Sequence, residues 1–565
     1  MLLDLIVDAY NSIEAHPYYS LGVFSVIIAA YSLFIYPFYL SPFKNIPGPY
    51  LFRISVLPSL HYQRTNKWVL KVHELHEIYG DVVLLSPKEI SVNGDLKYLN
   101  DIYTKNFPKS TFYQNFANHG KPNMFASMSN DIHLKYKKNL QSIYSKSAIF
   151  NPKNSTRISL VTNIRKLLKN IEDSSVEGTA PDFINAASEV NIHGKGYHEK
   201  DKKWFLGGKT KNLPIEVYSL FGSLALDVVS QFELGLKNGT NLLENPQQRE
   251  IVTYHRYVAS MVFYTTLLPS LWDYAATKLI LKSAQIVHDW QLGLYAKAEL
   301  NIPSFKEDEN LTTLETLRKH GFLKEAAYSF LSDNIFAGHE TTAIQLTYIT
   351  YELSRPHNQY LQKRLYDELH EAFSDAELIE DLEIVDKLPV LNAVLLEASR
   401  VHTSIPGAEP RVVDKVYKIK DTVIPKGTII SGQPYSYHRV PSVFPEPDVF
   451  KPERWLQQDD ETTEAFEART KKMHKYMIPF GKGIRMCLGM NVAQIEMKLA
   501  VANIYHKYHS KISSQWCDIV DKPEIVKMGD KYVGENKTDV EKMTMFDTYT
   551  TRPYNDECWL EFYRY

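Results

Sequence analysis

The pattern of apolar and charged positions divides the chain into a short apolar start and a long mixed body. Residues 15–43 contain no Asp, Glu, Lys or Arg, and residues 20–40 are almost entirely apolar. About 20 such residues span the hydrocarbon core of a bilayer as a helix, so the pattern predicts a single transmembrane anchor. The segment before it carries acids but no Lys or Arg, whereas Lys44 and Arg53 follow it. The positive-inside rule then predicts a lumenal start at 1–17, an anchor at 18–42 and a cytosolic body.

A cleaved signal peptide is the alternative for this segment, but it would need a basic start and a small-residue cleavage site. Residues 43–50 contain Ile-Pro-Gly-Pro. Because proline fixes its own φ angle, this segment predicts a stiff hinge between the anchor and the body at 51–565.

Within the body, the periodicity predicts a mainly α protein with small β-sheets, an α+β fold. Residues 82–85 and 89–92 are two short apolar runs around Pro87 and predict paired strands. Helical patterns dominate from about residue 133, and residues 303–356 contain no internal proline, which predicts one long buried helix. Strand-like pieces recur at 417–419, 428–430 and 559–562.

Composition adds bounds but little about function. The 565 residues are 44% hydrophobic with a net charge of −2, and no dense basic run or recognition motif points to nucleic acid. The three cysteines, Cys487, Cys517 and Cys558, are too few for a disulfide framework and suit a reducing compartment.

Cys487 lies in the most informative motif of the chain, which reads F-x-x-G-x-R-x-C-x-G from Phe480 to Gly489. Gly483 can supply a positive φ for a tight turn, Gly489 lets the next helix approach closely, and Arg485 is a permanent cation. We expect the loop to direct one thiolate at a haem iron, with backbone N–H groups holding the sulfur ionised. The alternative is a buried structural cysteine.

A second motif, A-G-x-E-T, runs from Ala337 to Thr341 within the predicted long helix. The Thr341 hydroxyl can bond back to the Ala337 carbonyl and, beside Gly338, open a groove for dioxygen and water. Glu340 can supply protons along this groove. A kinked core helix is the alternative, and a zinc site of the H-E-x-x-H type is excluded because Ala343 stands at the second histidine position.

A third motif is E-x-x-R, which places Glu397 and Arg400 on one helix face. The same spacing occurs at Glu315 and Arg318, which we interpret as part of a solvated face. Only Glu397 lies between the oxygen-binding and cysteine motifs.

These three motifs, in this order, resemble the cytochrome P-450 family of haem-thiolate monooxygenases. The resemblance covers residues 46–565 and is strongest to membrane-anchored microsomal members of fungal type. It implies the cytochrome P-450 fold, haem b as cofactor, O2 as cosubstrate and Cys487 as the axial ligand of the iron. Arg454, in Phe-Lys-Pro-Glu-Arg-Trp at 450–455, is implied as the partner of Glu397 and Arg400.

The resemblance also implies how the enzyme is supplied and where it works. Electrons would come from NADPH through a flavoprotein reductase, with cytochrome b5 as a further donor. The location would be the endoplasmic reticulum membrane, crossed once. Lysines on the segments that the family places on its proximal side could attract an acidic flavoprotein, or could be scattered surface charges: Lys135, Lys137, Lys138, Lys471, Lys472, Lys475 and Lys482.

Further cofactor contacts are implied for His133, Lys137 and Arg411. His133 and Lys137 resemble the family's Trp/His-x-x-x-Arg helix, although lysine keeps the charge without the bidentate fork of arginine. A surface cation is the alternative for Lys137 and for Arg411.

The substrate is a small, largely apolar or aromatic molecule by the same resemblance. The candidate pocket residues are Phe112, Phe116, Asp333, Phe336 and Ile405. Asp333 lies one helical turn before Ala337 and could anchor a substrate hydroxyl or amine, or could be a solvated carboxylate. A charged stretch at 191–213 is interpreted as a surface insertion, since its histidines fit no standard metal spacing.

The sequence therefore predicts insertion of one oxygen atom from O2 into an organic substrate. Two alternatives remain: a haem-thiolate isomerase or dehydratase that needs no external electrons, and a haem-binding sensor without turnover.

Overall fold

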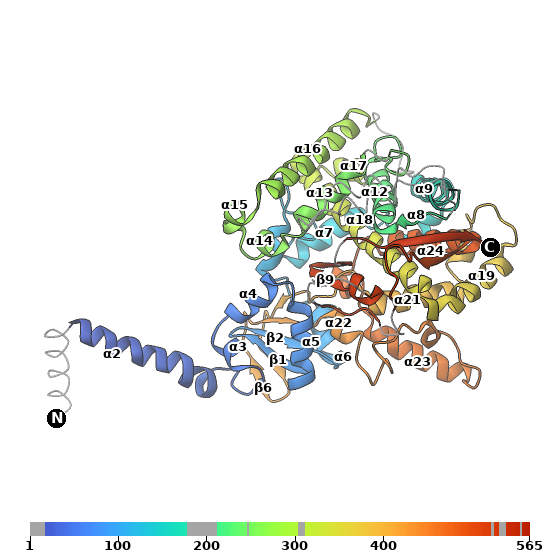
Figure 1. The fold of residues 1–565 in the computed structure, drawn as a ribbon. Helices are drawn as coiled ribbons and strands as arrows, with labels where there is room; N and C mark the ends of the chain where they lie inside the picture. Colours follow the sequence, from blue (N-terminus) through green and yellow to red (C-terminus); the bar gives the residue numbers. More distant parts are fainter. Residues whose placement is uncertain are drawn as a thin grey trace, which may run out of the picture.

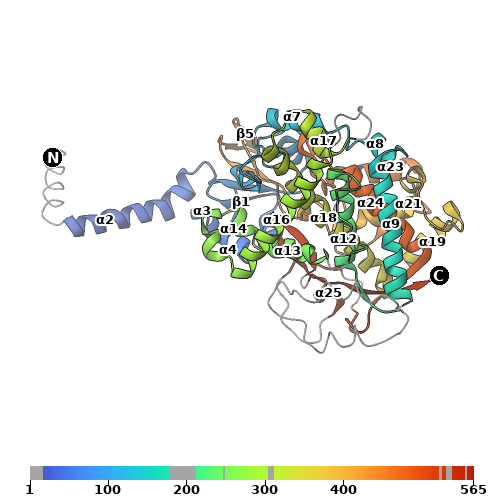
Figure 2. The ribbon, with the colours of Figure 1, turned by 90° about the horizontal axis from the view of Figure 1, so that it is seen from above.

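The computed structural model describes residues 17–177, 212–245, 248–302, 311–520, 525–529, 538–553 and 556–565. Helices dominate the body, small sheets lie at its margin, and the N-terminal helical arm projects away from it in both views (Figures 1 and 2). This confirms the mainly α fold with small sheets. The expected insertion at 191–213 lies almost wholly outside the described residues.

The helices of the first half of the body are α3 (Tyr50–Ile54), α4 (Leu57–Arg64), α5 (Trp68–Tyr79), α6 (Leu96–Leu99), α7 (Asn130–Leu140), α8 (Lys146–Phe150), α9 (Ser155–Asn170), α12 (Val217–Leu234), α13 (Glu250–Ala259), α14 (Val262–Thr266), α15 (Trp272–Ala275) and α16 (Lys278–Leu300). Those of the second half are α17 (Thr313–Lys319), α18 (Lys324–Ser354), α19 (Gln359–Phe373), α20 (Leu382–Val385), α21 (Pro389–Val401), α22 (Pro434–Tyr437), α23 (Thr463–Tyr476), α24 (Met490–Lys507) and α25 (Asp539–Lys542).

The largest sheet has the strand order β1-β2-β7-β4. Its strands are β1 (Val82–Ser86), β2 (Glu89–Val92), β7 (Ile429–Ser431) and β4 (Arg411–Val412). The first two strands pair antiparallel, β2 and β7 pair parallel, and β4 returns antiparallel to β7. The sheet therefore joins the start of the body to the segment after α21, as the apolar runs around Pro87 predict.

Three smaller sheets complete the fold. They pair β3 (Ile215–Glu216) and β8 (Tyr508–Ile512) with β11 (Trp559–Arg564), β5 (Tyr417–Ile419) with β6 (Thr422–Ile424), and β9 (Met545–Thr548) with β10 (Thr550–Pro553).

The central helix α18 lies within the proline-free stretch, and α17, which contains Glu315, precedes it. The proline-free stretch 303–356 divides into α17 and α18 because Gly321, with φ +76°, ends the first helical segment. A capping box starts α17, in which Thr312 and Glu315 bond each other's backbone. Glu315 is thus a helix-capping residue as well as part of a partly exposed face.

The arm consists of α2 (Pro17–Ala30) and the wider helical turns of η1 (Tyr31–Leu40). Within it, Ser20–Leu40 is long and apolar enough to cross a membrane, and 6% of its most apolar window is buried. The arm joins the body firmly. The Leu84 N–H donates to the Pro47 carbonyl at 2.8 Å, and a Cβ at Gly48 would lie 2.7 Å from the Leu84 oxygen, so only glycine fits against β1 here.

Candidate active site

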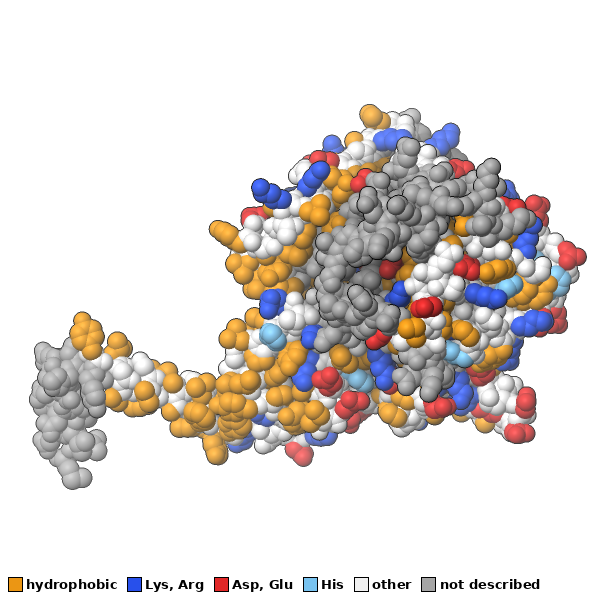
Figure 3. Space-filling model, in the orientation of Figure 1, with side chains coloured by type: hydrophobic (Ala, Val, Ile, Leu, Met, Phe, Trp, Pro, Cys, Tyr) orange, Lys and Arg blue, Asp and Glu red, His pale blue; other side chains and the backbone are white. Residues whose placement is uncertain are grey.

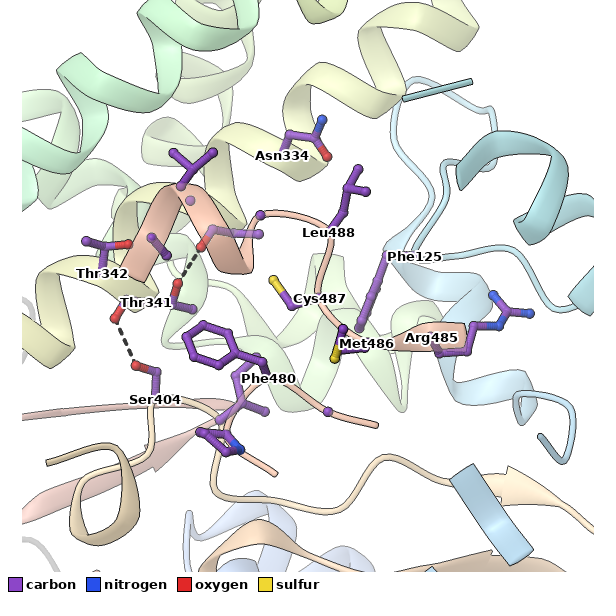
Figure 4. Close-up of a pocket in the computed structure, with 18 of the residues that line it drawn as sticks. Phe125, Asn334, Thr341, Thr342, Ser404, Phe480, Arg485, Met486, Cys487 and Leu488 are labelled. Carbon is purple, nitrogen blue, oxygen red and sulfur yellow. Dashed lines mark hydrogen bonds between the residues drawn. The ribbon is translucent and has the colours of Figure 1, made fainter. Parts of the chain in front are cut away.

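A cavity of about 260 Å³ lies inside the body between α18 and α24. Figure 4 shows Thr341 and Thr342 of α18 on one side of it and Cys487 and Phe480 of the cysteine loop on the other. The Thr341 motif and the cysteine motif therefore face the same cavity, and the E-x-x-R motif lies next to it.

The cysteine loop is built on two glycines in the left-handed region, Gly481 with φ +71° and Gly483 with φ +73°. A Cβ on Gly483 would lie 2.1 Å from the Tyr103 carbonyl oxygen, so the loop also needs glycine for its close approach to the body. The Cys487 N–H donates to the Phe480 carbonyl at 2.8 Å and closes the turn. The sulfur then lies at the cavity wall.

Burial and the backbone act in opposite directions on the ionisation of this sulfur. Burial raises the pKa of the Cys487 thiol to about 11, and the N–H groups of Gly489 and Met490 lower it only in part. The charge of a bound metal supplies what these donors lack, because a coordinating thiol is deprotonated outright. Gly489 differs from expectation: a Cβ there would meet no atom within 4 Å, so the glycine leaves space in the cavity and does not serve helix packing.

One end of the cavity holds two buried arginines and a buried lysine, Lys109, whose pKa burial lowers well below its usual value. Arg411, Lys109 and Arg485 are 1%, 4% and 9% exposed, and one carboxylate, Glu409, pairs with Arg411 at 3.1 Å. The guanidinium of Arg485 is bonded to neutral acceptors, including the Ser127 carbonyl at 2.8 Å. Burial and Arg411 lower the pKa of Arg485 to about 10. Such a cluster requires anions, and the two propionates of a haem fit it.

The other predicted cofactor contacts lie at the same end. Lys137 donates to the Ile484 carbonyl of the cysteine loop at 2.9 Å. Burial and the neighbouring Arg485 lower the pKa of His133 to about 3, so this ring is neutral, and its Nδ1 has no hydrogen-bond partner among the described residues. Lys109 was missed by the sequence analysis, because one lysine after Pro108 carries no signal of burial.

The oxygen-binding motif has the predicted local geometry. The Thr341 hydroxyl donates to the Ala337 carbonyl at 2.7 Å, and the Ser404 hydroxyl donates to the Thr341 carbonyl at 2.8 Å (Figure 4). The sequence did not reveal why position 338 requires glycine. A Cβ there would lie 2.6 Å from a methyl carbon of Val229. The glycine therefore lets α18 pack closely on α12.

Glu340 points away from the cavity, toward α12 and α13. Its Oε1 accepts a hydrogen bond from the Tyr218 hydroxyl at 2.7 Å, and the Arg256 guanidinium stacks on the Tyr218 ring at 3.7 Å. Burial opposes ionisation, but the guanidinium groups of Arg256 and Arg552 outweigh it and lower the pKa of Glu340. The carboxylate is thus held charged in a buried cluster behind the helix.

The structure brings Glu397, Arg400 and Arg454 together in the interior. Arg400 forms a bidentate pair with Glu397, at 2.8 and 3.0 Å, and the Arg454 Nε donates to the same carboxylate at 2.9 Å. The Trp455 indole and the Lys451 N–H complete its bonds. The cluster joins α21 to the segment that leads into the cysteine loop.

Two of the five candidate substrate residues line the cavity, and the three phenylalanines do not. Asp333 and Ile405 line the cavity. Phe116 lies behind the lining residue Phe125, with ring centroids 5.1 Å apart, and Phe112 lies 5.3 Å from Phe116. Phe336 instead packs edge-on against His339 at 6.2 Å.

Tyr549 was missed by the sequence analysis. It is the turn residue between β9 and β10, has φ +73°, and lies 5.3 Å from the Phe116 ring. A non-glycine residue in this region is uncommon, and tertiary packing that sequence pattern does not report places it there.

Comparison with known proteins assigns this site to a class. A sequence model described as Cytochrome P450 matches residues 206–533, more than half of the chain. The chain is 25% identical to "Cytochrome P450 monooxygenase FGM1" of Gibberella zeae, over 85% of this chain and 88% of that protein. It is 26% identical to "Cytochrome P450 monooxygenase TRI4" of Fusarium sporotrichioides, over 92% and 95%.

A solved structure agrees in fold. "Retinoic acid bound cyanobacterial CYP120A1" superposes with a TM-score of 0.63 at 17% identity, covering 92% of this chain and 99% of that one. Fold and site define a haem-thiolate oxidoreductase. The chain belongs to the cytochrome P450 family and is a monooxygenase, as the sequence analysis predicts.

Proposed function

We propose that the protein inserts one oxygen atom of O2 into a small, largely apolar or aromatic substrate, using electrons that a flavoprotein reductase takes from NADPH. The observation that carries the proposal is the placement of Cys487, the cation cluster and Thr341 around one cavity. Haem b supplies the activation of O2 when it is bound. The second oxygen atom leaves as water, which consumes two electrons and two protons.

The residues of this chain would each have a definite task. Cys487 would bind the haem iron, and Arg485, Arg411 and Lys109 would bind the propionates, with His133 and Lys137 beside them. Thr341 would position O2 and the proton that it receives. Glu340 would supply this proton after its side chain has moved away from Tyr218. Glu397, Arg400 and Arg454 would fix the segment that carries the cysteine loop.

The test is the carbon monoxide difference spectrum of the purified protein, recorded with dithionite and separately with NADPH and a microsomal reductase. We expect the strongly red-shifted Soret band of thiolate ligation with both reductants. The band with dithionite alone would favour an isomerase, a dehydratase or a sensor. Its absence with both would overturn the ligation by Cys487.

Asp333 supports a more specific proposal about the substrate. It lines the cavity, and burial raises the pKa of its carboxyl to about 7, although the neighbouring Lys109 opposes the shift. A carboxylate in such a setting attracts a cationic amine more strongly than a neutral ligand. We expect amine ligands to bind more tightly as the pH rises through about 7. Asp333→Asn should remove this dependence and leave neutral ligands unaffected, and equal binding of both ligand types to wild type and variant would exclude the role.

The location we propose is the endoplasmic reticulum membrane, with the arm as anchor and the body cytosolic. Figure 3 shows hydrophobic side chains along the arm and over the neighbouring part of the body. They include Leu57 of α4 and Tyr274 of α15, which are 69% and 89% exposed. Removal of residues 1–42 should weaken the association with microsomal vesicles in flotation, and unchanged flotation would exclude the anchor.

A further inference from the structure

Behind α18, three polar side chains converge in the interior without bonding one another directly. They are His255 of α13 and the neighbours His339 and Glu340 of α18, which are 4%, 0% and 2% exposed. The two imidazole rings meet edge to face, with centroids 5.1 Å apart and planes at 64°. The His339 Nε2 lies 3.7 Å from the Glu340 Oε2, which is too far for a hydrogen bond.

The hydrogen bonds of His339 fix its tautomer. Its Nδ1 contacts the Ile335 carbonyl at 2.9 Å. Because a carbonyl oxygen can only accept, Nδ1 carries the proton, and Nε2 is the acceptor nitrogen of the neutral ring. Burial keeps the ring neutral by lowering the pKa of His339, although Glu340 opposes the shift. Nε2 has no hydrogen-bond partner among the residues that the structure describes.

Among the described residues, His255 also has an unpaired ring nitrogen. Its Nε2 also has no partner within the described part of the chain, and burial together with His339 lowers its pKa. An unpaired buried polar group destabilises a core, and here two such nitrogens belong to rings in contact with each other. A buried water typically makes about three hydrogen bonds and removes such a cost where polar partners converge.

A single water placed between them would satisfy all three groups. It would donate one hydrogen to the His339 Nε2 and the other to the Glu340 Oε2, and accept from His255 in the tautomer that carries its proton on Nε2. The charged and titratable groups around the cluster are Tyr218 and Glu216 on the side of α12, Arg256 on α13, and Arg552 and Asp556 near the C-terminus. The two arginines hold Glu340 ionised, so the carboxylate needs a nearby donor whenever it accepts a proton.

We propose that His339 and His255 are positioning residues that hold a water molecule against Glu340, and that this water passes protons to Glu340 from His255. The inference rests on the proposed role of Glu340 as proton donor at the oxygen site. In the step, an O–H bond of the water breaks as one forms on the Glu340 Oε2. The His255 Nε2–H bond breaks as the water recovers its hydrogen, and the imidazole takes a proton from solvent at Nδ1. No electron moves.

The first test is structural and independent of turnover. A high-resolution crystal structure of the full-length, haem-loaded protein should contain one ordered water within about 2.7–3.2 Å of both Nε2 atoms and the Glu340 Oε2. Direct bonds from these nitrogens to protein atoms, or a dry site, would overturn the proposal.

The second test uses variants of the two histidines. His339→Leu and His255→Leu should each raise the share of NADPH electrons that end in hydrogen peroxide and the solvent isotope effect on product formation. We expect a change on the order of tenfold, below the range for losing a group that transfers the proton directly. The double variant should be no worse than either single one, since both act through one water.

Controls separate a relay from packing. Trp290→Phe changes the aromatic neighbour of His255, 5.7 Å away, without removing a nitrogen that faces Glu340, and should leave both readouts unchanged. If His339→Leu does not bind haem, His339→Gln keeps an acceptor and should behave close to wild type. Wild-type isotope effects and peroxide yields in both leucine variants would exclude the relay.

The outcome also distinguishes this inference from the proposed function. Failure of the wild-type protein to give the thiolate band or NADPH-dependent product contradicts the proposed function. A silent Glu340→Gln variant contradicts the role of Glu340. A sensitive Glu340→Gln together with silent histidine variants contradicts the water relay alone.

Discussion

Single hydroxyl and carboxyl groups decide the chemistry at the residue scale, because the cavity is otherwise largely apolar. The Thr341 hydroxyl is such a group. It donates to the Ala337 carbonyl at 2.7 Å, so its oxygen lone pairs remain available on the cavity side. Glu340, one residue earlier, faces the opposite way into the cluster with Tyr218. In the proposed function, the two neighbours would divide the handling of the proton between the cavity and the interior.

Thr341→Val is expected to keep the shape of this site and lose its hydroxyl. Product formed per NADPH should fall on the order of 100-fold, the lower end of the range for losing one proton-transfer group. Oxygen consumption should continue, with hydrogen peroxide as the product. Thr341→Ser keeps the hydroxyl and should retain most coupling. Equal coupling in the valine and serine variants would remove Thr341 from the proton pathway.

At the scale of elements, close packing of α18 on α12 sets the position of the oxygen-binding segment. A Cβ at Gly338 would lie 2.6 Å from a methyl carbon of Val229. Gly338→Ala should therefore destabilise the fold by about 1–3 kcal/mol, as overpacking of a core does. In denaturant titrations, Val229→Ala combined with Gly338→Ala should recover much of this loss. Additive losses would show that the glycine is needed for backbone freedom, not for space.

The Glu397 cluster couples two further elements, α21 and the segment before the cysteine loop. Its charges lower the pKa of Glu397 although burial opposes this. A lowered folded-state pKa stabilises the fold above the unfolded value of about 4.3, and this contribution is lost as the pH falls through the folded value. Glu397→Gln should cost about 3–5 kcal/mol near pH 7, because it leaves two arginines uncompensated, and this difference from wild type should shrink under acid.

The matched control for this prediction is Glu315→Gln in the second E-x-x-R sequence. Glu315 is partly exposed and caps α17, so we expect a loss of at most about 1 kcal/mol without the same acid dependence. Chemical unfolding followed by tryptophan fluorescence at several pH values measures both variants. A similar loss in both variants would contradict the locking role of Glu397.

Particular residues show what sequence could and could not predict about these elements. The cysteine loop, the Thr341 bond and the strands around Pro87 follow from local spacing, which a sequence records directly. The residue at which α17 ends could not be placed from the sequence, because the positive φ of Gly321 is not visible in it. Lys109, Val229, Tyr218 and Tyr549 were missed because their roles depend on neighbours distant in the chain. The outward direction of Glu340 likewise depends on Arg256 and α13.

At the scale of the whole molecule, positive side chains share one surface around the cysteine loop. Lys137 bonds the Ile484 carbonyl and Lys482 bonds the Lys475 carbonyl at 3.3 Å, so α7, α23 and the loop form one continuous face. Lys138 and Lys471 are exposed on it. An acidic reductase that docks here would come close to Cys487.

Charge reversal tests this docking. Lys138→Glu with Lys471→Glu should slow reduction by the flavoprotein on the order of tenfold at low salt, because steering by opposite charges raises association rates by about 10- to 1,000-fold. The difference from wild type should shrink as added salt screens the charges. Lys282→Glu, on exposed α16, is the control for a change of net charge. Reduction by dithionite should be equal in all variants, because a small reductant needs no docking face. If the control slows reduction as much as the double variant does, the net charge of the protein governs its association with the reductase. The docking face proposed here is then wrong.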